Sequence, residues 1–400
     1  MKITDVEFTP VRMPLRHRES SHKVQRDGIM AVIVKLKSDK GIIGWGECCC
    51  GPNMSSILET LKSIQPFIIG ANPWNREALW FDVFKHGIWS MREPTFNYAW
   101  SGIDIALWDL CAKSCNQPIY NLLGGLKRKS VNYFFYLPTH YDPKLDLNLL
   151  EKECHRGHEL GYDVFYLKTA GTDFNDEVKA VKSVRKIIGP SKKIRIDCNE
   201  GWSLSEAVKK IEVLDKWNID FAEQPIPAQP IELMEELKKK TKVALASNEG
   251  MALNSLIRKE TLRKRSCDVI VTNIAFVGRI GELYRLGYEA SDLGIEFCLA
   301  SNGELGIASA ANHHVLLSLP KIVKGNQQIS SMLKDDILLK PLPIAEGPNW
   351  GIHLGPGIGV VIDEDKITKY HNEYLKFGEY MPKDPSSIKN QSPSFIYSKN

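Results

Sequence analysis

Three carboxylates recur at a constant spacing in the middle of the chain and could together hold a metal ion. Asp197, Glu223 and Glu249 each follow an apolar run, and successive members lie 26 residues apart. That interval is about the length of one strand and one helix in a parallel α/β barrel. Side chains at the carboxyl ends of neighbouring barrel strands converge, so three oxygen donors would meet near the barrel axis. Mg²⁺ prefers such ligands, and we expect it as the cofactor.

Each of these acids taken singly would suit a solvated loop or a helix N-cap as well as a metal site. Their common position in three successive units favours the metal site. Cys198 follows Asp197 directly. Because side chains alternate along a strand, we expect its thiol to point away from the carboxylate, into the layer behind.

The composition is ordinary for a soluble globular enzyme. Hydrophobic residues make up 43% of the 400 residues, charged residues 25%, and the formal net charge is +4. These values give no reason to expect nucleic acid as a partner. No apolar run approaches the roughly 18 residues of a membrane span. Residues 1–8 alternate like a strand and lack a signal-peptide pattern, so we expect a cytoplasmic protein without membrane contact.

The nine cysteines form an odd set with no repeated spacing, and Cys48, Cys49 and Cys50 are consecutive. Adjacent cysteines rarely build a disulfide framework, so free and mostly buried thiols in a reducing cytoplasm are expected. Cys50 lies beside a Gly-Pro turn and is the candidate for an exposed, reactive thiol.

The elements that would position the carboxylates fall into two units. Residues 1–125 predict a smaller α+β unit, with strands at 3–11 and 30–37 and helical patterns at 55–69, 74–89 and 99–113. The polar stretch 17–26 between the two strands is too long for a tight hairpin. Loops of that length in compact domains are usually functional or disordered.

Residues 126–330 predict a parallel barrel in which strands alternate with helices. Strands are expected at 131–136 and 163–168, a weak eighth candidate lies at 321–324, and the others end near Asp197, Glu223, Ser247, Asn273 and Leu299. Residues 331–382 break into loops and short strands, which indicates that the chain returns to cover the first unit. The tail 383–400 is rich in Ser, Lys, Asn and Pro and is expected to be flexible.

Several short motifs carry a family resemblance. They are Gly44-Trp45-Gly46-Glu47, Asp104 to Asp109 followed by Leu122-Leu123-Gly124-Gly125, Asp197-Cys198-Asn199, Glu223-Gln224-Pro225, Glu249, and Gly355 to Val360. With them, residues 1 to 365 resemble the enolase superfamily, and within it the mandelate racemase type of acid-sugar enzyme. The resemblance implies an α/β fold, a modified TIM barrel of the (β/α)7β type, with an N-terminal α+β capping domain completed by the C-terminal segment. A glutamate as third ligand, as at Glu249, resembles the mandelate racemase and dehydratase branch more than the muconate cycloisomerase branch.

The resemblance also implies a reaction, the removal of a proton α to a carboxylate, with Mg²⁺ stabilising the enediolate that forms. It implies Lys168 as the base, at the end of the second barrel strand. The family's Lys-x-Lys motif reads Tyr166-Leu167-Lys168 here, so the like charge that would lower the pKa of Lys168 is missing. Tyr166 is the second candidate catalytic residue, as a hydrogen-bond donor to a substrate oxygen or as a proton carrier.

On the other side of the substrate, the family's proton carriers are absent. Many relatives place a His on the seventh strand, oriented by an Asp on the sixth, and this chain has Ala300 and Asn273 at those positions. The lysine of the cycloisomerase branch also belongs at position 273. A glutamate of the eighth strand is replaced by Asn326 or Gln327. A two-base racemase is therefore disfavoured, and a one-base reaction at Lys168 remains open.

Polar residues around the expected pocket would bind the substrate. Arg18 and Arg26 suit a distal carboxylate or hydroxyl groups, because a guanidinium binds carboxylate in a bidentate manner. The acid that assists the leaving group stays open among Tyr166, Tyr136, His140 and a histidine of residues 17–22. The expected substrate-binding residues are Arg18, Arg26, Tyr136, His140, Asn199, Asn273, Ser301 and Asn326.

These observations predict a Mg²⁺-dependent lyase that dehydrates a hydroxylated carboxylic acid, an aldonic or aldaric sugar acid, to a 2-keto-3-deoxy product. Lys168 would remove the α-proton and a β-hydroxyl would leave. One alternative is a one-base isomerase or cycloisomerase of a sugar acid. The other is a binding protein for metal and sugar acid whose catalysis has decayed. We expect a homo-oligomer.

Overall fold

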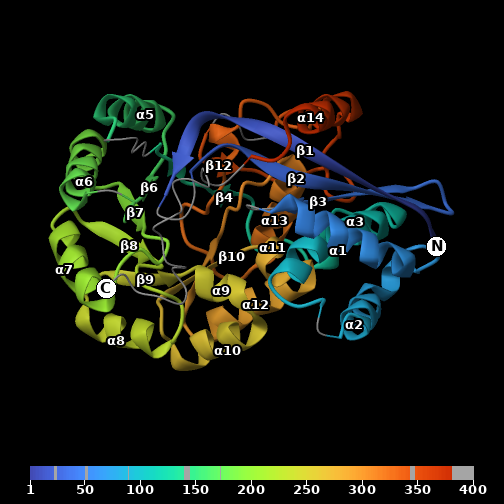
Figure 1. The fold of residues 1–400 in the computed structure, drawn as a ribbon, viewed down its shortest axis with the longest axis horizontal. Helices are drawn as coiled ribbons and strands as arrows, with labels where there is room; N and C mark the ends of the chain where they lie inside the picture. Colours follow the sequence, from blue (N-terminus) through green and yellow to red (C-terminus); the bar gives the residue numbers. More distant parts are fainter. Residues whose placement is uncertain are drawn as a thin grey trace.

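The computed structural model describes residues 1–21, 25–49, 53–88, 90–138, 145–171, 173–342 and 347–380. An α+β cap lies beside a curled parallel sheet with helices on its outer side (Figure 1). The expected fold class, a modified TIM barrel with an N-terminal α+β capping domain, is confirmed. The expected flexible tail and His140 lie outside the described residues.

The cap sheet consists of three antiparallel strands in the order β1 (Ile3–Ser20), β2 (Gln25–Ser38) and β3 (Ile43–Cys49). The expectation that β1 stops at Val11 and that residues 17–26 form a long loop was wrong. Pairing of β1 with β2 continues past Pro14, after a register irregularity, to Ser20 opposite Gln25. Val11, Met13 and Leu15 are buried and lie at alternate positions, which extends the apolar face of the strand into the stretch that looked polar.

The helices of the cap are α1 (Met54–Ile68), α2 (Arg76–His86), α3 (Thr95–Ser114) and α4 (Ile119–Leu122), with the short 3-10 helix η1 (Pro73–Asn75) before α2. Helices α1 and α3 pack directly on this sheet. Helix α3 is buried along nearly its whole length. A Cβ at Gly46 would lie 1.9 Å from the carbonyl oxygen of Gly102. The backbones of β3 and α3 therefore meet directly, which explains the Gly-Trp-Gly motif.

The barrel sheet has seven parallel strands in chain order. They are β5 (Phe135–Tyr136), β6 (Val164–Lys168), β7 (Lys193–Asp197), β8 (Ile219–Glu223), β9 (Ala244–Ser247), β10 (Val269–Thr272) and β11 (Glu296–Leu299). The helices that connect and follow them are α5 (Leu147–Glu159), α6 (Phe174–Ile188), α7 (Leu204–Asp215), α8 (Glu232–Lys240), α10 (Ser255–Lys264), α12 (Ile280–Asp292) and α13 (Gly306–Ser318). The short helices α9 (Glu249–Leu253) and α11 (Ile274–Val277) follow β9 and β10 directly.

The first and eighth strands differ from expectation. The predicted strand 131–136 is split into β4 (Val131–Asn132), which pairs with β12 (Asn349–Trp350), and β5. The expected eighth strand at 321–324 is not a regular strand. Residues 323–327 instead close the barrel, where the Gln327 amide donates to the Leu299 carbonyl at 3.1 Å and the Phe134 amide to the Asn326 carbonyl at 3.0 Å.

Arg195 binds this irregular closing segment from inside the barrel. Its buried guanidinium donates to the carbonyl of Lys324 at 2.5 Å and also to the carbonyl of Gly325. Gly325 has φ of +78°, and a Cβ there would lie 2.5 Å from the Val164 side chain. Both carbonyl groups therefore point toward the Arg195 side chain inside the barrel, at the place where the segment departs from a regular strand.

The C-terminal segment returns to the cap after the 3-10 helix η2 (Ser330–Met332). Its last helix, α14 (Glu364–Phe377), packs on β1. His371 Nδ1 lies 2.8 Å from the Pro10 carbonyl oxygen, and Lys35 pairs with Glu364 at 2.6 Å. Within the described ranges, no helix has the length and apolar character of a membrane span.

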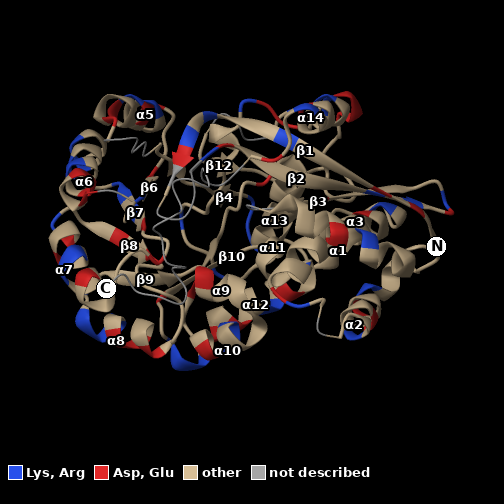
Figure 2. Ribbon diagram, viewed as in Figure 1, with Lys and Arg blue, Asp and Glu red and all other residues tan. Residues whose placement is uncertain are grey.

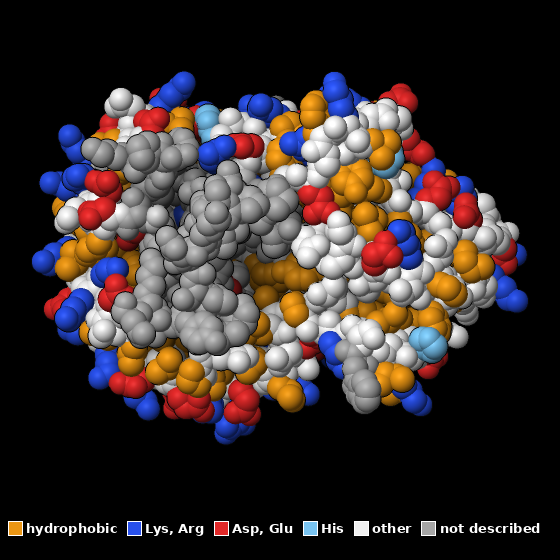
Figure 3. Space-filling view, viewed as in Figure 1, with side chains coloured by type: hydrophobic (Ala, Val, Ile, Leu, Met, Phe, Trp, Pro, Cys, Tyr) orange, Lys and Arg blue, Asp and Glu red, His pale blue; other side chains and the backbone are white. Residues whose placement is uncertain are grey.

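Surface charge is mixed rather than segregated. Lys and Arg alternate with Asp and Glu over the outer helices α5 to α8 and α10 (Figure 2). On the face shown in Figure 3, side chains of both signs are interspersed along the rim. Binding of nucleic acid would require a continuous basic surface, and the described atoms of this face form none.

Buried carboxylates join the cap to the barrel and to the C-terminal segment. Glu47 accepts hydrogen bonds from the amides of Leu305 at 2.6 Å and Ala308 at 2.9 Å, at the start of α13. Asp104 accepts from the amide of Ile280, the first residue of α12, at 2.7 Å. These acids belong to the family motifs, and in this structure they bind backbone amides between domains.

Asp109 makes the corresponding contact inside the cap. It accepts from the amides of Trp45 in β3 and Ile358 in the C-terminal segment, both at 2.9 Å, and from Lys113 Nζ at 2.6 Å. A Cβ at Gly357, whose φ is +73°, would lie 2.0 Å from Asp109 Oδ1. The Gly-Pro-Gly motif therefore lets the C-terminal segment approach this carboxylate closely.

We predict that Asp109→Ala lowers the free energy of unfolding by about 3 kcal/mol, because two buried amides lose their acceptor. Urea unfolding followed by circular dichroism measures this. Asp173→Ala is the matched control, since Asp173 caps the exposed start of α6 through the Asn175 amide and should cost only about 1 kcal/mol. Equal losses in the two variants would contradict the anchoring role of Asp109.

Candidate active site

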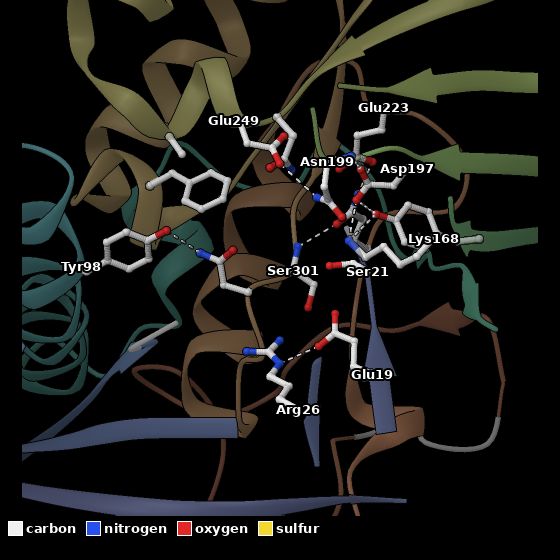
Figure 4. A pocket seen from close by; sticks show the side chains of 16 residues that line it. Glu19, Ser21, Arg26, Tyr98, Lys168, Asp197, Asn199, Glu223, Glu249 and Ser301 are labelled. Atoms are coloured by element: carbon white, nitrogen blue, oxygen red, sulfur yellow. Dashed lines mark hydrogen bonds and ion pairs between the residues drawn. The ribbon is translucent and has the colours of Figure 1, made fainter. Parts of the chain in front are cut away.

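A pocket of about 360 Å³ lies between the cap and the carboxyl ends of the barrel strands (Figure 4). The cap contributes Glu19, Ser21, Arg26 and Tyr98. The barrel contributes Tyr166, Lys168, Asp197, Asn199, Glu223, Asn248, Glu249, Ala252, Phe276, Ser301, Asn302 and Gln327. The lining is rich in charged and hydrogen-bonding groups, as a site for a small polar acid requires.

Strand register places the main acids and the lysine side by side. Lys168 ends β6 and pairs with Asp197, and Asp197 ends β7 and pairs with Glu223 at the end of β8. Asp197 and Glu223 are buried, each 1% exposed. Cys198 packs in the outer apolar layer with Ile196, on the side away from the pocket, as alternation along the strand predicts.

Two local motifs hold the acids in place. Asn199 has a left-handed backbone conformation with φ of +44°, and its backbone N–H donates a hydrogen bond to Asp197 Oδ1 at 2.9 Å. The Gln224 side-chain oxygen accepts from the amides of Asn248 at 3.0 Å and Gly250 at 3.3 Å. It thereby fixes the start of α9, so that Glu249 enters the pocket from a helix rather than from the strand end.

The three carboxylates repel one another. Burial and the negative charges of Asp197 and Glu249 raise the pKa of Glu223 well above its usual range, although Lys168 opposes this. A divalent cation among the three oxygens would remove this repulsion, so the donor set fits Mg²⁺ in both charge and ligand type. The side chains now have other partners, because Gln327 donates to Glu223 at 2.7 Å and Asn199 to Glu249 at 3.0 Å.

As they lie, no three acidic, His or Cys side chains of the described residues surround a common point. Binding of one cation by Asp197, Glu223 and Glu249 would therefore require these side chains to turn away from their present partners.

Lys168 interacts with both Tyr166 and Asp197. Its Nζ lies 2.5 Å from Asp197 Oδ2 and 3.3 Å from the Tyr166 hydroxyl, and this hydroxyl also donates to Asp197. Burial lowers the pKa of Lys168, but the charges of Asp197, Glu19 and Glu223 outweigh it and raise the pKa. The Tyr166 ring stacks on Phe134 with centroids 4.6 Å apart, which fixes its hydroxyl beside the lysine.

The cap hairpin contributes a buried ion pair. Glu19 and Arg26 are opposite one another in the β1–β2 register, and Arg26 Nε lies 2.6 Å from Glu19 Oε2. Tyr136 donates to the second oxygen of Glu19 at 3.0 Å. Burial raises the pKa of Glu19, but Arg26 and Lys168 outweigh it and lower the pKa, so the carboxylate remains ionised.

Arg18 does not lie in this pocket. It is the residue before Glu19 and points to the opposite side of β1, where it forms an exposed pair with Asp27 at 2.9 Å. Of the two arginines expected to bind substrate, Arg26 therefore lines this pocket and Arg18 does not.

Other expected substrate-binding residues divide between the pocket and its supports. Asn199 and Ser301 line the pocket, and Tyr136 reaches it through Glu19. Asn273 does not line it, because its side chain caps α11 through the Phe276 amide at 3.0 Å. Asn326 also lies outside, since its side chain accepts from the Leu299 amide at 2.9 Å and stabilises the barrel closure. The neighbouring Gln327 takes the pocket position instead.

Two further residues at the pocket, Glu304 and Tyr98, were not predicted from the sequence. Glu304 is buried beside the pocket residue Ser301 and accepts from Ser301 Oγ at 2.7 Å and from Asn273 Nδ2 at 3.0 Å. Burial raises its pKa. A carboxylate soon after the β11 strand end could have drawn attention to Glu304. Tyr98 stands near the start of the apolar helix α3, where a polar aromatic residue is the available signal.

Family models cover most of the chain. A model described as "Mandelate racemase / muconate lactonizing enzyme, N-terminal domain" matches residues 3–124. A model described as "Enolase C-terminal domain-like" matches residues 150–366. The two matches correspond to the cap and to the barrel with part of the returning segment.

Individual relatives catalyse different reactions. The chain is 31% identical to an N-succinyl-L-Arg/Lys racemase of Bacillus cereus, over 92% of this chain and 98% of the relative. The crystal structure of that racemase matches with a TM-score of 0.83 at 29% identity, over 92% and 98% of the two chains. An arabinonate dehydratase of Saccharolobus solfataricus is 27% identical, over 85% of this chain and 90% of the dehydratase. A chloromuconate cycloisomerase of Delftia acidovorans is 28% identical, over 92% of this chain and 99% of the cycloisomerase.

We predict that Glu223→Gln weakens Mg²⁺ binding by more than about tenfold, because the central member of the carboxylate set loses its charge. Titration calorimetry with MgCl₂ measures this. Glu260→Gln, on the exposed surface of α10, is the control and should leave the affinity unchanged. Unchanged affinity in Glu223→Gln would contradict the metal assignment.

Proposed function

Because this chain belongs to the enolase superfamily, in its mandelate racemase and muconate lactonizing enzyme group, we propose that it is a Mg²⁺-dependent acid-sugar dehydratase. The observation that carries the proposal is the row formed by Lys168, Asp197 and Glu223 across β6, β7 and β8. It places a potential base directly beside the carboxylates that suit a divalent cation.

Asp197, Glu223 and Glu249 would hold Mg²⁺, which when bound supplies positive charge to stabilise the negative charge that develops on a substrate carboxylate. The remaining steps depend on residues of this chain. If Asp197 binds a cation, its carboxylate attracts the ammonium group of Lys168 less strongly. This favours the neutral form of the Lys168 amine, which can accept a proton. Tyr166 stays neutral because burial and Asp197 raise its pKa, and it keeps Lys168 positioned.

The pocket favours a polyhydroxylated acid. Its cap side offers the ionised pair of Glu19 and Arg26, and the segment after β11 offers Ser301 and Asn302. Carboxylate, guanidinium, hydroxyl and amide groups all suit binding of sugar hydroxyls. The arabinonate dehydratase among the relatives acts on a substrate of this class.

Elimination fits the groups on either side of the substrate. Lys168 offers one base, whereas Asn273 and Ala300 offer none at the positions where the family resemblance implies an Asp and a His. Removal of the α-proton by Lys168, followed by departure of a β-hydroxyl, needs one base and yields a 2-keto-3-deoxy acid. Isomerisation is the second candidate, because the N-succinyl-L-Arg/Lys racemase is 31% identical to this chain.

A library of aldonic and aldaric acids with five or six carbons, incubated with the protein and MgCl₂, tests the proposal. Release of a 2-keto acid, detected with semicarbazide, is the expected result. Epimerised substrate without keto acid would favour the isomerase. Tight binding without turnover of any member would favour a binding protein.

We predict that Lys168→Ala reduces keto-acid formation by at least about a thousandfold and leaves Mg²⁺ bound, because the base is lost and the carboxylates remain. Steady-state kinetics and calorimetry measure the two effects. Lys179→Ala, which changes an exposed lysine on α6, is the control and should retain wild-type rates. Full activity in Lys168→Ala would remove the base assignment.

A further inference from the structure

The pocket wall opposite Lys168 carries a second phenol, that of Tyr98. Figure 4 shows Tyr98 and Lys168 on opposite sides of the pocket, with Ser301 between them. Tyr98 comes from helix α3 of the cap, whereas Lys168 comes from the barrel. The neighbours of Tyr98 along this wall, Phe276 and Asn302, cannot donate an acidic proton.

The hydrogen bonding of Tyr98 leaves its proton available to a ligand. Asn302 Nδ2 donates to the Tyr98 oxygen at 3.4 Å, so the tyrosine acts as the acceptor in this contact. The two other tyrosines near Lys168 differ, because Tyr166 donates its proton to Asp197 and Tyr136 donates its proton to Glu19. Burial raises the pKa of Tyr98, so its hydroxyl carries its proton when substrate binds.

Contacts between the cap and the barrel fix the position of Tyr98. Its ring meets the Phe276 ring edge to face, with centroids 6.1 Å apart. The preceding residue, Asn97, donates to the Phe276 carbonyl at 2.8 Å, and Glu93 pairs with Arg258 of α10 at 2.6 Å. A hydroxyl held in this way loses little freedom when it meets a substrate, which is the property required of a positioned proton donor.

We propose that Tyr98 is the second proton-transfer residue of the site and donates its proton to the departing β-hydroxyl on the face opposite Lys168. The inference rests on the proposed dehydration and names its acid. Tyr98 would take the place of the proton carriers that Asn273 and Ala300 no longer provide.

Lys168 takes the α-proton, and the electron pair of that C–H bond first passes into the substrate carboxylate to give the enediolate. In a second step this electron pair forms the Cα–Cβ double bond as the Cβ–O bond breaks. The departing oxygen takes the Tyr98 proton and leaves as water. Solvent reprotonates Tyr98, Lys168 returns its proton to solvent, and the enol product becomes the ketone.

The test separates proton removal from loss of water. The library member that the wild-type protein dehydrates is incubated with MgCl₂ in D₂O, and ¹H NMR follows both α-proton exchange and keto-acid formation. We expect Tyr98→Phe to form keto acid at least about a hundredfold more slowly while α-proton exchange continues, since general acids contribute factors of about 10² to 10⁴. Lys168→Ala should lose both reactions.

Tyr162→Phe is the matched control, because Tyr162 also has a hydroxyl contact of 3.4 Å, to the Gly347 carbonyl, but lies outside the pocket. Both of its rates should match those of the wild type. Asn302→Ala leaves the phenol in place but removes the amide that orients it. It should slow keto-acid formation less than Tyr98→Phe does, with exchange retained.

A wild-type rate of keto-acid formation in Tyr98→Phe would overturn the inference and leave the proposed function intact. Loss of both reactions in a normally folded Tyr98→Phe would also overturn it, because the hydroxyl would then act in substrate binding. If Tyr98→Phe does not fold, wild-type behaviour of Asn302→Ala decides against the inference. Neither exchange nor dehydration by the wild-type protein on any library member would remove the proposed function together with the inference.

Discussion

Backbone amides bound by buried carboxylates are the constraint on which this structure depends. Glu47 and Asp104 belong to the cap, and each binds the amide end of a barrel helix. A buried carboxylate without partners is costly, so these contacts are strongly favoured once the interface excludes water. They set the position of the cap over the strand ends and with it the distance between the two walls of the pocket.

Within the pocket, parallel strand register does the rest of the positioning. Lys168, Asp197 and Glu223 occupy equivalent places on three neighbouring strands, so no loop conformation is needed to bring them together. The replacement of a family lysine by Tyr166 changes the electrostatics of this row. A neutral hydroxyl cannot lower the pKa of Lys168 by like charge. Burial still lowers this pKa, but the charges of the surrounding carboxylates outweigh burial and raise it.

The sequence was informative where side-chain pattern and backbone structure are directly related. The apolar runs before Asp197 and Glu223 are regular strands, so their ends could be located and the barrel recognised. Prediction failed where pairing between distant segments decides the outcome. The β1–β2 register separates Arg26 from Arg18, and the irregular closure around Arg195 separates Gln327 from Asn326. Tyr98 joins the pocket through packing between domains, which no local pattern records.

The return of the C-terminal segment to the cap has a consequence for biosynthesis. Helix α14 covers β1, and Asp109 and Ile358 connect segments that are synthesised far apart in time. A nascent chain carries its first strand long before the helix that covers it exists, and contacts of such large sequence separation form slowly. The cap is therefore the first unit to be synthesised and the last to be completed, so a truncated chain would lack the helix that packs on β1, the strand that carries Glu19 into the pocket.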